Sequence, residues 1–483
     1  MVGFGERILK SRDNLPNPAF GRIMSPKQDA GRQTTFSWSK PSRVDMPDES
    51  SEDRESEFDR QLSSLFNGYD GPGFAIRLWD GWRWNLSQDR PACTLVVNTR
   101  DALAALAGGA DEVTLGEAFI HKQLDVEGDL FSALSVAEFL MRRPRDFRLR
   151  AVESILACAT GLKRCASHGL KHSWKRDQAS IAYHYDQPVE FYRPWLGETL
   201  VYSCAYFRSL DDSLDDAQMQ KLELVCRKLR MKAGDHFLDI GCGWGGLVLH
   251  AGLRHHVVAH GITLSREQTR VANQRIKGAG LDDRCIVEHR DYRSCREFRE
   301  AFDVIASIGM FEHVGLPKLP LYFSAVRSLL KPGGAFLNHG IAKASSSSAR
   351  SRSFIDNYVF PDGKLVTITE AINAAEGAGF EVRDVENLRE HYDLTLHKWA
   401  DGLERNKDAL LKIVPEKTYR IWLLCMVGSA RAFRRGDIGV HQILLSRLDR
   451  GCSRLPLVRD DWYRGEELEL KPYSEDAHLP TTK

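Results

Sequence analysis

The stretch FLDIGCGWGGLVLHAG, residues 237–252, decides the fold of this 483-residue chain. Its apolar beginning is typical of a buried strand, and it runs directly into a turn that contains Gly241, Gly243, Gly245 and Gly246. A strand that ends in such a glycine-rich turn is typical of an open α/β sheet that binds a ligand at the turn.

Strand-like runs recur after this stretch, with helical material between most of them. That alternation predicts a parallel, doubly wound α/β sheet. A helix is also predicted just before the turn, at 217–230, with one face made of Met219, Leu222, Val225, Cys226 and Leu229. The predicted strands are HFLDI (236–240), VVAHGITL (257–264), CIVEH (285–289), FDVIASI (302–308) and AFLNHGI (335–341).

The glycine-rich turn satisfies the pattern G-x-G-x-x-G, the fingerprint of a dinucleotide site. Such a site usually has an acidic residue about 20 residues further on to hold the ribose, whereas the second strand here ends in GITLS. Asp239 instead lies shortly before the first glycine, where its carboxylate suits a ligand that carries an ammonium and a sulfonium. S-adenosylmethionine fits this pattern. A dinucleotide, or a turn that serves only tight packing, are the alternatives.

Three more residues are expected near that ligand. The run SREQ, from Ser265 to Gln268, spells a capping box, in which Gln268 closes a helix N-terminus. Gln268 has a second interpretation as a ribose contact, and one side chain can serve both purposes. Asp291 and Tyr292 follow the third strand, where an adenine contact is expected.

Composition and charge narrow the class of protein. With 42% hydrophobic and 28% charged residues, the chain has the composition of a soluble globular protein. A net charge of +1 argues against a general nucleic-acid binder. No apolar run is long enough to span a bilayer, and the polar first residues are unlike a signal peptide, so we expect a cytoplasmic protein.

Changes in composition and in predicted secondary structure along the chain indicate five segments. These are a disordered tail (1–57), a small α+β domain (58–150), a basic linker (151–178), the ligand-binding domain (179–460) and a C-terminal tail (461–483). The basic stretch has two interpretations, a contact for anionic lipid headgroups or a solvated connection. Its residues are Arg142, Arg143, Arg145, Arg148, Lys163, Arg164, Lys171, Lys175 and Arg176, together with Trp174.

Neither a metal site nor a disulfide framework is predicted. The ten cysteines include no CxxC pair, and most are expected to be small buried hydrophobic residues. Glu312 and His313 are adjacent, which is not the spacing of metal ligands on a helix.

Several segments in order resemble the cyclopropane-fatty-acyl-phospholipid synthase family of S-adenosylmethionine-dependent class I methyltransferases, which have a Rossmann-like catalytic domain. The resemblance runs from about residue 60 to 450, and 113–134 resembles the small domain that these synthases carry ahead of the catalytic one. The matching segments are AYHYDQPVEFY (182–192), VYSCAYF (201–207), FLDIGCGWGG (237–246), GITLSREQ (261–268), SIGMFEHVG (307–315), LKPGGAFLNHGI (330–341), NYVFPDG (357–363), REHYDLTLHKW (389–399) and GSARAFRRGDIGVHQILLSR (428–447).

The resemblance implies methylene transfer from S-adenosylmethionine to a cis double bond of unsaturated phospholipid acyl chains. It implies peripheral association with the inner face of the membrane, and it suggests a homodimer. It implies a bicarbonate ion that accepts a proton, surrounded by Cys204, Glu312, His339, the Ile341 backbone and Tyr392. The cofactor contacts expected from the residues and the resemblance together are Tyr202, Ser203, Asp239, Gly241, Gly243, Gly245, Thr263, Leu264, Gln268, Asp291 and Tyr292.

The chemistry of an alkene sets what such a site must contain. Methyl transfer to an alkene leaves a carbocation, and closing a cyclopropane then requires a base that removes a proton from the new methyl. Glu312 follows the fourth predicted strand, and His339 lies in the fifth. Both are near the strand ends where ligands bind. His339 could instead be a structural histidine of the strand whose hydrogen bonds are satisfied, and Tyr392 could be an aromatic anchor for the helix that follows it. The alternative functions are transfer that leaves a methyl branch, and a non-catalytic lipid-binding protein.

Cys204 could be a nucleophile, a metal ligand or a packing residue. A nucleophile needs a substrate with a leaving group that it can attack, and methyl transfer to an alkene offers none. We therefore expect the Cys204 thiol to face a small anion, with Tyr202 and Ser203 near the cofactor.

Overall fold

A computed structural model describes residues 59–60, 62–86, 90–107, 111–142, 187–345, 354–358 and 365–463. The chain divides into two units, 1–58 and 59–483, and all described residues belong to the second. The predicted tail at 1–57, the basic linker at 151–178 and nearly all of the C-terminal tail lie outside the described residues, so these parts of the domain assignment stay predictions.

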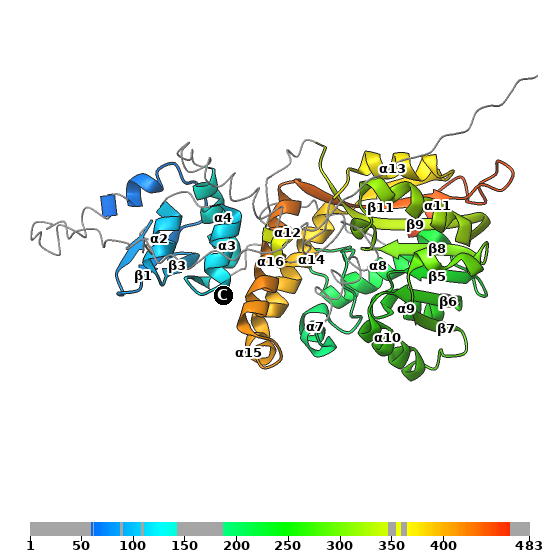
Figure 1. Cartoon of the computed structure of the whole chain (residues 1–483), viewed down its shortest axis with the longest axis horizontal. Coiled ribbons are helices and arrows are strands. Elements are labelled where there is room, and N and C mark those ends of the chain that lie inside the picture. The colour runs from blue at the N-terminus through cyan, green and yellow to red at the C-terminus, as the bar shows by residue number, and fades with distance from the viewer. Residues whose placement is uncertain are drawn as a thin grey trace, which may run out of the picture. The chain divides into compact units, whose positions relative to one another are not determined.

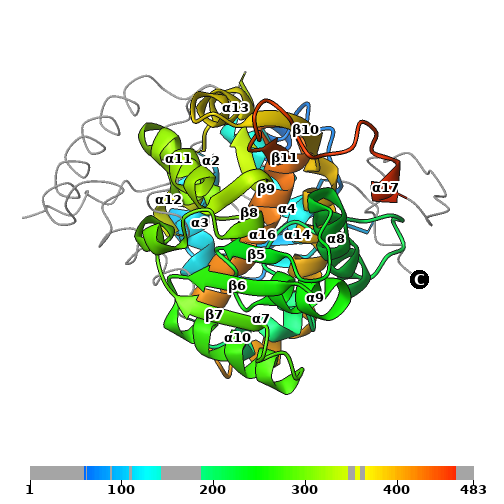
Figure 2. The same ribbon diagram turned by 90° about the vertical axis from the view of Figure 1, so that its right-hand side faces the viewer.

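A seven-stranded sheet forms the frame of the larger domain, in the order β10-β11-β9-β8-β5-β6-β7 (Figure 2). The predicted doubly wound fold is confirmed, but one strand departs from it. β11 runs antiparallel to both of its neighbours, whereas β9, β8, β5, β6 and β7 are mutually parallel. The strands are β5 (His236–Ile240), β6 (Val258–Thr263), β7 (Cys285–His289), β8 (Phe302–Ile308), β9 (Leu330–Lys343), β10 (Glu381–Asn387) and β11 (Ile438–Ser446).

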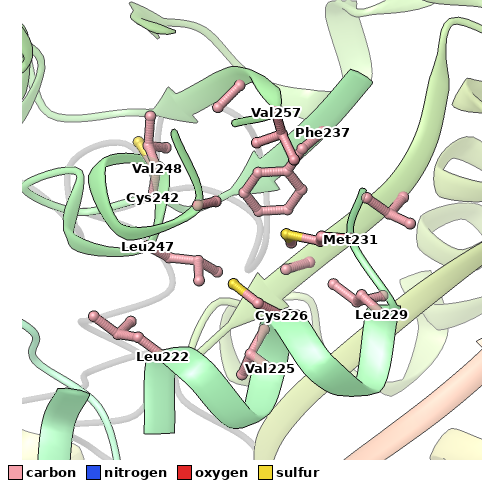
Figure 3. Close-up of a cluster of buried hydrophobic side chains, with 14 of the residues drawn as sticks. Leu222, Val225, Cys226, Leu229, Met231, Phe237, Cys242, Leu247, Val248 and Val257 are labelled. Carbon is pink, nitrogen blue, oxygen red and sulfur yellow. The ribbon is translucent and has the colours of Figure 1, made fainter. Parts of the chain in front are cut away.

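Helices cover both faces of this sheet, and alternate residues of each strand supply the two cores. On one face, Phe237 packs in a cluster with residues of α8 (Leu214–Leu229), α9 (Gly246–His255) and α10 (Arg266–Gly278), part of which is shown in Figure 3. On the other face, Leu238 and Ile240 pack with residues of α11 (Leu319–Leu329) and α13 (Ile368–Gly377). This period-two alternation buries both faces of the parallel strands.

The buried face of α8 differs from the predicted one at a single residue. Leu222, Val225, Cys226 and Leu229 are buried as predicted, but Met219 is 43% exposed. Gln218 and Lys221 occupy the buried face instead. The spacing explains the difference, because 218, 221, 222 and 225 follow the i, i+3, i+4, i+7 pattern of one helical face and 219 falls beside it.

A separate four-stranded sheet, in the order β2-β1-β3-β4, lies within the range of the predicted small domain, 58–150. Its strands are β1 (Phe74–Leu78), β2 (Arg83–Asn85), β3 (Cys93–Val97) and β4 (Leu124–Gly128), and its helices are α2 (Arg100–Ala107), α3 (Glu112–Ile120) and α4 (Leu130–Met141). The buried Arg420 of α16 (Glu416–Arg434) joins the two domains, since it donates to Asp125 at 2.8 and 3.1 Å and to the Phe119 carbonyl at 3.1 Å.

The remaining helices all follow the four-stranded sheet in the chain, and α12 (Phe354–Tyr358) contacts α3 (Figure 1). None of the helices in the described ranges is both long and apolar enough to cross a bilayer. Seven of the eight described cysteines are buried, as predicted, and Cys452 is exposed. The other helices are α7 (Val189–Leu196), η1 (Tyr292–Ser294), η2 (Arg296–Phe298), η3 (Phe311–His313), η4 (Leu316–Lys318), α12 (Phe354–Tyr358), α14 (Arg389–Arg405), α15 (Lys407–Leu410) and α17 (Asp460–Tyr463).

Candidate active site

A cavity of about 160 Å³ opens at the carboxyl ends of β5, β6, β7 and β8. The chain order reverses at β5, because β6 and β7 extend the sheet on one side of it and β8 and β9 on the other. Ligands of doubly wound proteins bind at such a switch point, outside the carboxyl ends of the strands. The topology thus brings the glycine-rich turn after β5 together with loops from three other strands.

The glycine-rich turn has no room for side chains at two of its positions. Gly241 has a φ of +82°, and a Cβ there would lie 2.9 Å from the Met310 Cβ. A Cβ on Gly246, the first residue of α9, would lie 2.6 Å from the Val201 Cγ2. The turn therefore allows a ligand to approach the backbone beside the start of α9.

Asp239 brings a buried carboxyl group to the cavity wall, next to the turn. Burial raises the pKa of Asp239 to about 7, although the nearby Lys221 ammonium acts to lower it. Burial also lowers the pKa of Lys221 to about 8, against the opposing effect of Cys204 and Asp239. A cationic ligand in the cavity would favour the charged form of Asp239.

Two polar side chains of α8 hold the loop that carries Tyr202 and Ser203. The Lys221 Nζ donates to the Ser203 Oγ at 3.0 Å, and the Gln218 Nε2 donates to the Ser203 carbonyl at 2.9 Å. Both side chains are buried. Because these bonds fix one wall of the cavity, Lys221 and Gln218 belong to the site although we did not predict them.

Tyr202 lies on an aromatic platform beside the cavity. Its ring stacks on Trp399, with centroids 5.0 Å apart, and meets Trp195 and Trp422 edge-on at 5.8 and 5.7 Å. Electron-rich ring faces attract cations, so this wall suits a sulfonium or ammonium group.

Gln268 makes the predicted capping box only in part, and its ribose contact stays a prediction. Its backbone N–H donates to the Ser265 Oγ at 3.3 Å, which is the cap predicted from the sequence. The other half of the capping box is made by Thr263, because the Ser265 N–H donates to the Thr263 Oγ1 at 3.3 Å. The Thr263 hydroxyl donates to the Gln268 Oε1 at 2.6 Å, and both residues line the cavity.

Asp291 and Tyr292 also line the cavity, where an adenine contact was predicted. The Asp291 carboxylate is already paired, since it accepts from the Arg293 guanidinium at 2.6 and 2.9 Å and from the Arg293 backbone N–H at 2.8 Å. All the predicted cofactor contacts, Leu264 included, line this cavity except Gly245, which caps the start of α9 with a φ of +77°.

A second group of polar residues gathers around β9, next to the cavity. The Ile341 backbone N–H donates to the Glu312 Oε1 at 2.7 Å, which joins β9 to η3. His339 lies two residues earlier on β9 and is paired in register with Gln442 of β11. The amide nitrogen of Gln442 lies 3.2 Å from the His339 Nδ1, so the ring proton of a neutral His339 lies on Nε2.

Cys204 and Tyr392 meet at the carbonyl of Leu388, the residue before α14. The Cys204 Sγ donates to this oxygen at 3.8 Å, and the Tyr392 N–H donates to it at 3.1 Å. The Leu388 N–H in turn donates to the Val440 carbonyl at 2.8 Å, and Val440 is paired with Ile341. One backbone network thus links all five predicted catalytic residues, none of which lines the cavity itself.

Burial dominates the ionisation of this second group. It raises the pKa of Glu312 to about 7, against the lowering effect of the Ile341 hydrogen bond. It lowers the pKa of His339 well below the usual range, and the positive charges of Lys221 and Lys228 add to this. It raises the pKa of the Cys204 thiol. Near pH 7 the site therefore holds a neutral imidazole, a neutral thiol and a carboxyl group that readily exchanges its proton.

Two atoms of this group stand out because nothing satisfies them. The Glu312 Oε2 and the His339 Nε2 are buried and have no hydrogen-bond partner in the described part of the chain. Buried polar atoms are nearly always hydrogen-bonded, so two such atoms, one on η3 and one on the adjoining β9, point to a polar ligand.

Comparison with known proteins places these features in a family context. The family model "Mycolic acid cyclopropane synthetase" matches residues 172–443. The "Probable fatty acid methyltransferase" of Pseudomonas putida is 39% identical over 394 residues, which cover 80% of this chain and 96% of that protein. The "Cyclopropane-fatty-acyl-phospholipid synthase" of Escherichia coli K12 is 35% identical over 264 residues, which cover 55% of this chain and 66% of that protein.

A solved structure agrees with these sequence matches. The mycolic acid cyclopropane synthase CmaA1, crystallised with SAH and CTAB, superimposes with a TM-score of 0.53 and is 32% identical. The superposition covers 56% of this chain and 98% of that one.

Proposed function

Because this chain belongs to the mycolic acid cyclopropane synthetase family and is an S-adenosylmethionine-dependent methyltransferase, we propose that it cyclopropanates unsaturated phospholipid acyl chains. In this reaction the methyl carbon bonds to one alkene carbon as its bond to the sulfonium sulfur breaks and S-adenosylhomocysteine leaves. The resulting cation loses a proton from that methyl to a base, and the ring closes on the other alkene carbon. The observation that carries the proposal is the pair of buried, unpartnered atoms on Glu312 and His339, beside the cofactor cavity.

The cavity at the carboxyl ends of the strands suits S-adenosylmethionine. Asp239 offers a negative charge, and the ring of Tyr202 offers a π face. Both suit the positively charged ammonium and sulfonium groups of this ligand. The glycine-rich turn admits the ligand close to the start of α9, and Thr263 and Gln268 present polar groups at the end of β6. We assign these residues to cofactor binding, with Lys221 and Gln218 positioning the loop of Ser203.

The second polar group suits proton removal in a dry site. A carbocation survives only where water is excluded; His339 and Cys204 are buried, and Glu312 is half-buried with its Oε2 atom shielded from solvent. His339 can donate its Nε2 proton, and Glu312 can donate or accept one because its pKa lies near 7. These groups fit a small oxyanion such as bicarbonate, which when bound supplies a base for the methyl proton. Tyr392 and the Ile341 backbone position this group.

Cys204→Ser is expected to keep most of its activity. The thiol is buried and neutral, and it makes weak hydrogen bonds to the carbonyls of Ala205 and Leu388, at 3.2 and 3.8 Å. Exchanging one such bond costs about 1 kcal/mol, so kcat should fall by less than about tenfold. Steady-state kinetics on unsaturated phospholipid vesicles measures this. A serine variant as inactive as a Glu312 variant would reopen the nucleophile hypothesis.

A second candidate product is a methyl-branched chain. Two relatives with 39% identity carry the name "Probable fatty acid methyltransferase", which specifies no cyclopropane. The same residues could transfer the methyl group while the cation loses a proton from the acyl chain instead of from the new methyl.

Deuterium counting separates the two products. The purified full-length chain is incubated with vesicles of a phospholipid with cis-unsaturated chains and with S-adenosylmethionine whose methyl carries three deuterium atoms. A cyclopropane retains two of them and has no alkene, whereas a chain that loses its own proton retains all three. Mass spectrometry and proton NMR of the released fatty acids distinguish the outcomes. Unchanged acyl chains with intact cofactor binding would refute both.

We also propose that the enzyme reaches phospholipid from the cytoplasmic side of the membrane, held by the basic linker. Each basic residue near an anionic surface contributes about 1 kcal/mol to binding. Replacing Lys163, Arg164, Lys171, Lys175 and Arg176 with glutamine should therefore weaken binding to anionic vesicles strongly. Co-sedimentation measures this, with S-adenosylmethionine affinity as the control that should not change. Equal sedimentation of the variant and the parent would identify this stretch as a solvated linker.

The predicted homodimer and the absence of a nucleic-acid partner stay predictions.

A further inference from the structure

Three potential metal ligands lie together where α8 packs on α9, outside the active site, and a fourth contacts two of them. The donor atoms of Cys226, His250 and His255 all lie within 4.8 Å of one another. The Glu223 carboxylate joins them, because its Oε2 lies 3.0 Å from the His250 Nε2 and 3.2 Å from the His255 Nε2. One thiol and two imidazoles therefore lie within reach of one ion, and one carboxylate contacts both imidazoles.

The two separations between Glu223 and the histidines are compatible with a tetrahedral ion. Ligands that bind Zn²⁺ at about 2.0–2.1 Å in a tetrahedron lie about 3.3 Å from one another. The two separations from Glu223 are within a few tenths of an ångström of that value. Sulfur, nitrogen and carboxylate oxygen are all regular ligands of Zn²⁺. The Nε2 atoms of His250 and His255 both contact the same Glu223 oxygen, so both imidazoles point toward one place.

The surroundings hold the four ligands in place. The other carboxylate oxygen of Glu223 accepts from the Arg227 Nε at 2.9 Å, and such an outer hydrogen bond orients a ligating carboxylate. Cys226 is fully buried in the core cluster of Figure 3, and His250 is 6% exposed. The Nδ1 of His250 is buried and has no hydrogen-bond partner in the described ranges of the chain. The polar cluster therefore borders a dry apolar core.

We propose that Glu223, Cys226, His250 and His255 form a structural Zn²⁺ site that fastens α8 to α9. Four protein ligands fill a tetrahedron and leave no open position for catalysis, which is typical of structural zinc. The two helices also line the cofactor cavity, through Lys221 and Leu222 on α8 and Gly246 and Leu247 on α9. A bound ion would thus stabilise the cavity walls, because it would hold together the two helices that form part of them.

This proposal departs from the sequence prediction, in which no metal site appeared. Glu223 and His250 are 27 residues apart, and no CxxC or paired-histidine spacing marks them. Only the packing of α8 on α9 makes the four donors neighbours. Without a metal ion the two histidines and Arg227 form a hydrogen-bonded cluster around Glu223, and that cluster is the alternative to test.

The test uses the untagged full-length chain carrying Cys452→Ser, which removes the one described cysteine that is exposed. After chelation and dialysis, the protein is titrated with Zn²⁺ alone, and bound metal is counted by elemental analysis. Co²⁺ is titrated separately, because a thiolate ligand gives a charge-transfer absorption band in the near ultraviolet. We expect one ion per chain, the thiolate band, and a rise of several degrees in Tm with Zn²⁺.

Ligand variants and a matched control decide the outcome. His255→Gln, at the half-buried end of α9, should weaken zinc binding by more than about a hundredfold, and Cys226→Ala should remove the cobalt thiolate band. His256→Asn changes the neighbouring exposed histidine, whose φ of +53° asparagine tolerates, and should bind zinc like the parent. Zinc binding below one ion per chain, or full binding by His255→Gln, would overturn the proposal in favour of the hydrogen-bonded cluster.

Discussion

Glu312→Gln is expected to lower kcat by about 10²–10⁴, the contribution typical of a positioned acid or base. The substitution keeps the shape of the side chain and still lets it accept the Ile341 hydrogen bond, which measures 2.7 Å. It removes the carboxyl group that exchanges protons near pH 7 and replaces the buried, unpartnered Oε2. Single-turnover formation of product from deuterated S-adenosylmethionine and unsaturated vesicles measures the loss.

Cofactor affinity separates this catalytic effect from a folding defect. Glu312 does not line the cofactor cavity, so the dissociation constant for S-adenosylmethionine should stay within about twofold of the parent value. Glu376→Gln, at an exposed position on α13, makes the same chemical change far from these residues in the fold and should keep full activity. A Glu312→Gln enzyme with the parent kcat would remove Glu312 from the catalytic group.

Asp239→Asn is expected to weaken S-adenosylmethionine binding by about 10–100-fold, which is the value of a hydrogen bond to a charged partner. The carboxyl group is 3% exposed and lies on the cavity wall next to the glycine-rich turn. Asparagine has nearly the same volume, so the turn should keep its conformation while the negative charge is lost. Isothermal titration with S-adenosylmethionine measures the change.

The pH dependence of binding gives this prediction a second, independent observable. The pKa of Asp239 is about 7 before the ligand binds, so below pH 7 a cationic ligand must first displace a proton. Affinity for S-adenosylmethionine should therefore rise as the pH increases from about 6 to 8. Lys221, with a pKa of about 8, loses positive charge over the upper part of this range, which acts in the same direction.

The Asp239→Asn variant should lose the part of this rise that is centred near pH 7, while the part due to Lys221 remains. A variant whose affinity rises with pH as steeply as that of the parent would show that another group titrates there. Binding that is equally tight in the variant and the parent would place the sulfonium and ammonium away from Asp239.

The parts of the fold that were predictable depend on local pattern. The bounds of β5, β7 and β8 coincide with the predicted strands because apolar runs bounded by turn residues mark buried strands directly. The antiparallel direction of β11 was not predicted, since the direction of a strand depends on where the chain crosses over and not on its own residues. Met219 was misplaced because several helical faces were compatible with one short apolar pattern.

In the candidate site, too, the predictable residues are those marked by their neighbours in the chain, and the others depend on tertiary contacts. Asp239, Gly241 and Thr263 were found because they lie beside strand ends and a recognisable turn. Lys221 and Gln218 were missed because a lysine and a glutamine within a helix usually face solvent, and only their contacts with Ser203 show otherwise. The spacing of 218, 221, 222 and 225 was a signal that could have found them.

The sequence by itself determined the α/β class, the order of the strands along the chain, the ligand-binding turn and the family resemblance, because each follows from residues close together in the chain. The tertiary structure alone decided that Glu312, Ile341, Leu388 and Cys204 share one backbone network, and that Glu223 and His250 meet across two helices. These contacts join residues far apart in the chain, and burial, which sets the pKa values of Asp239 and Glu312, exists only once the sheet and helices have packed.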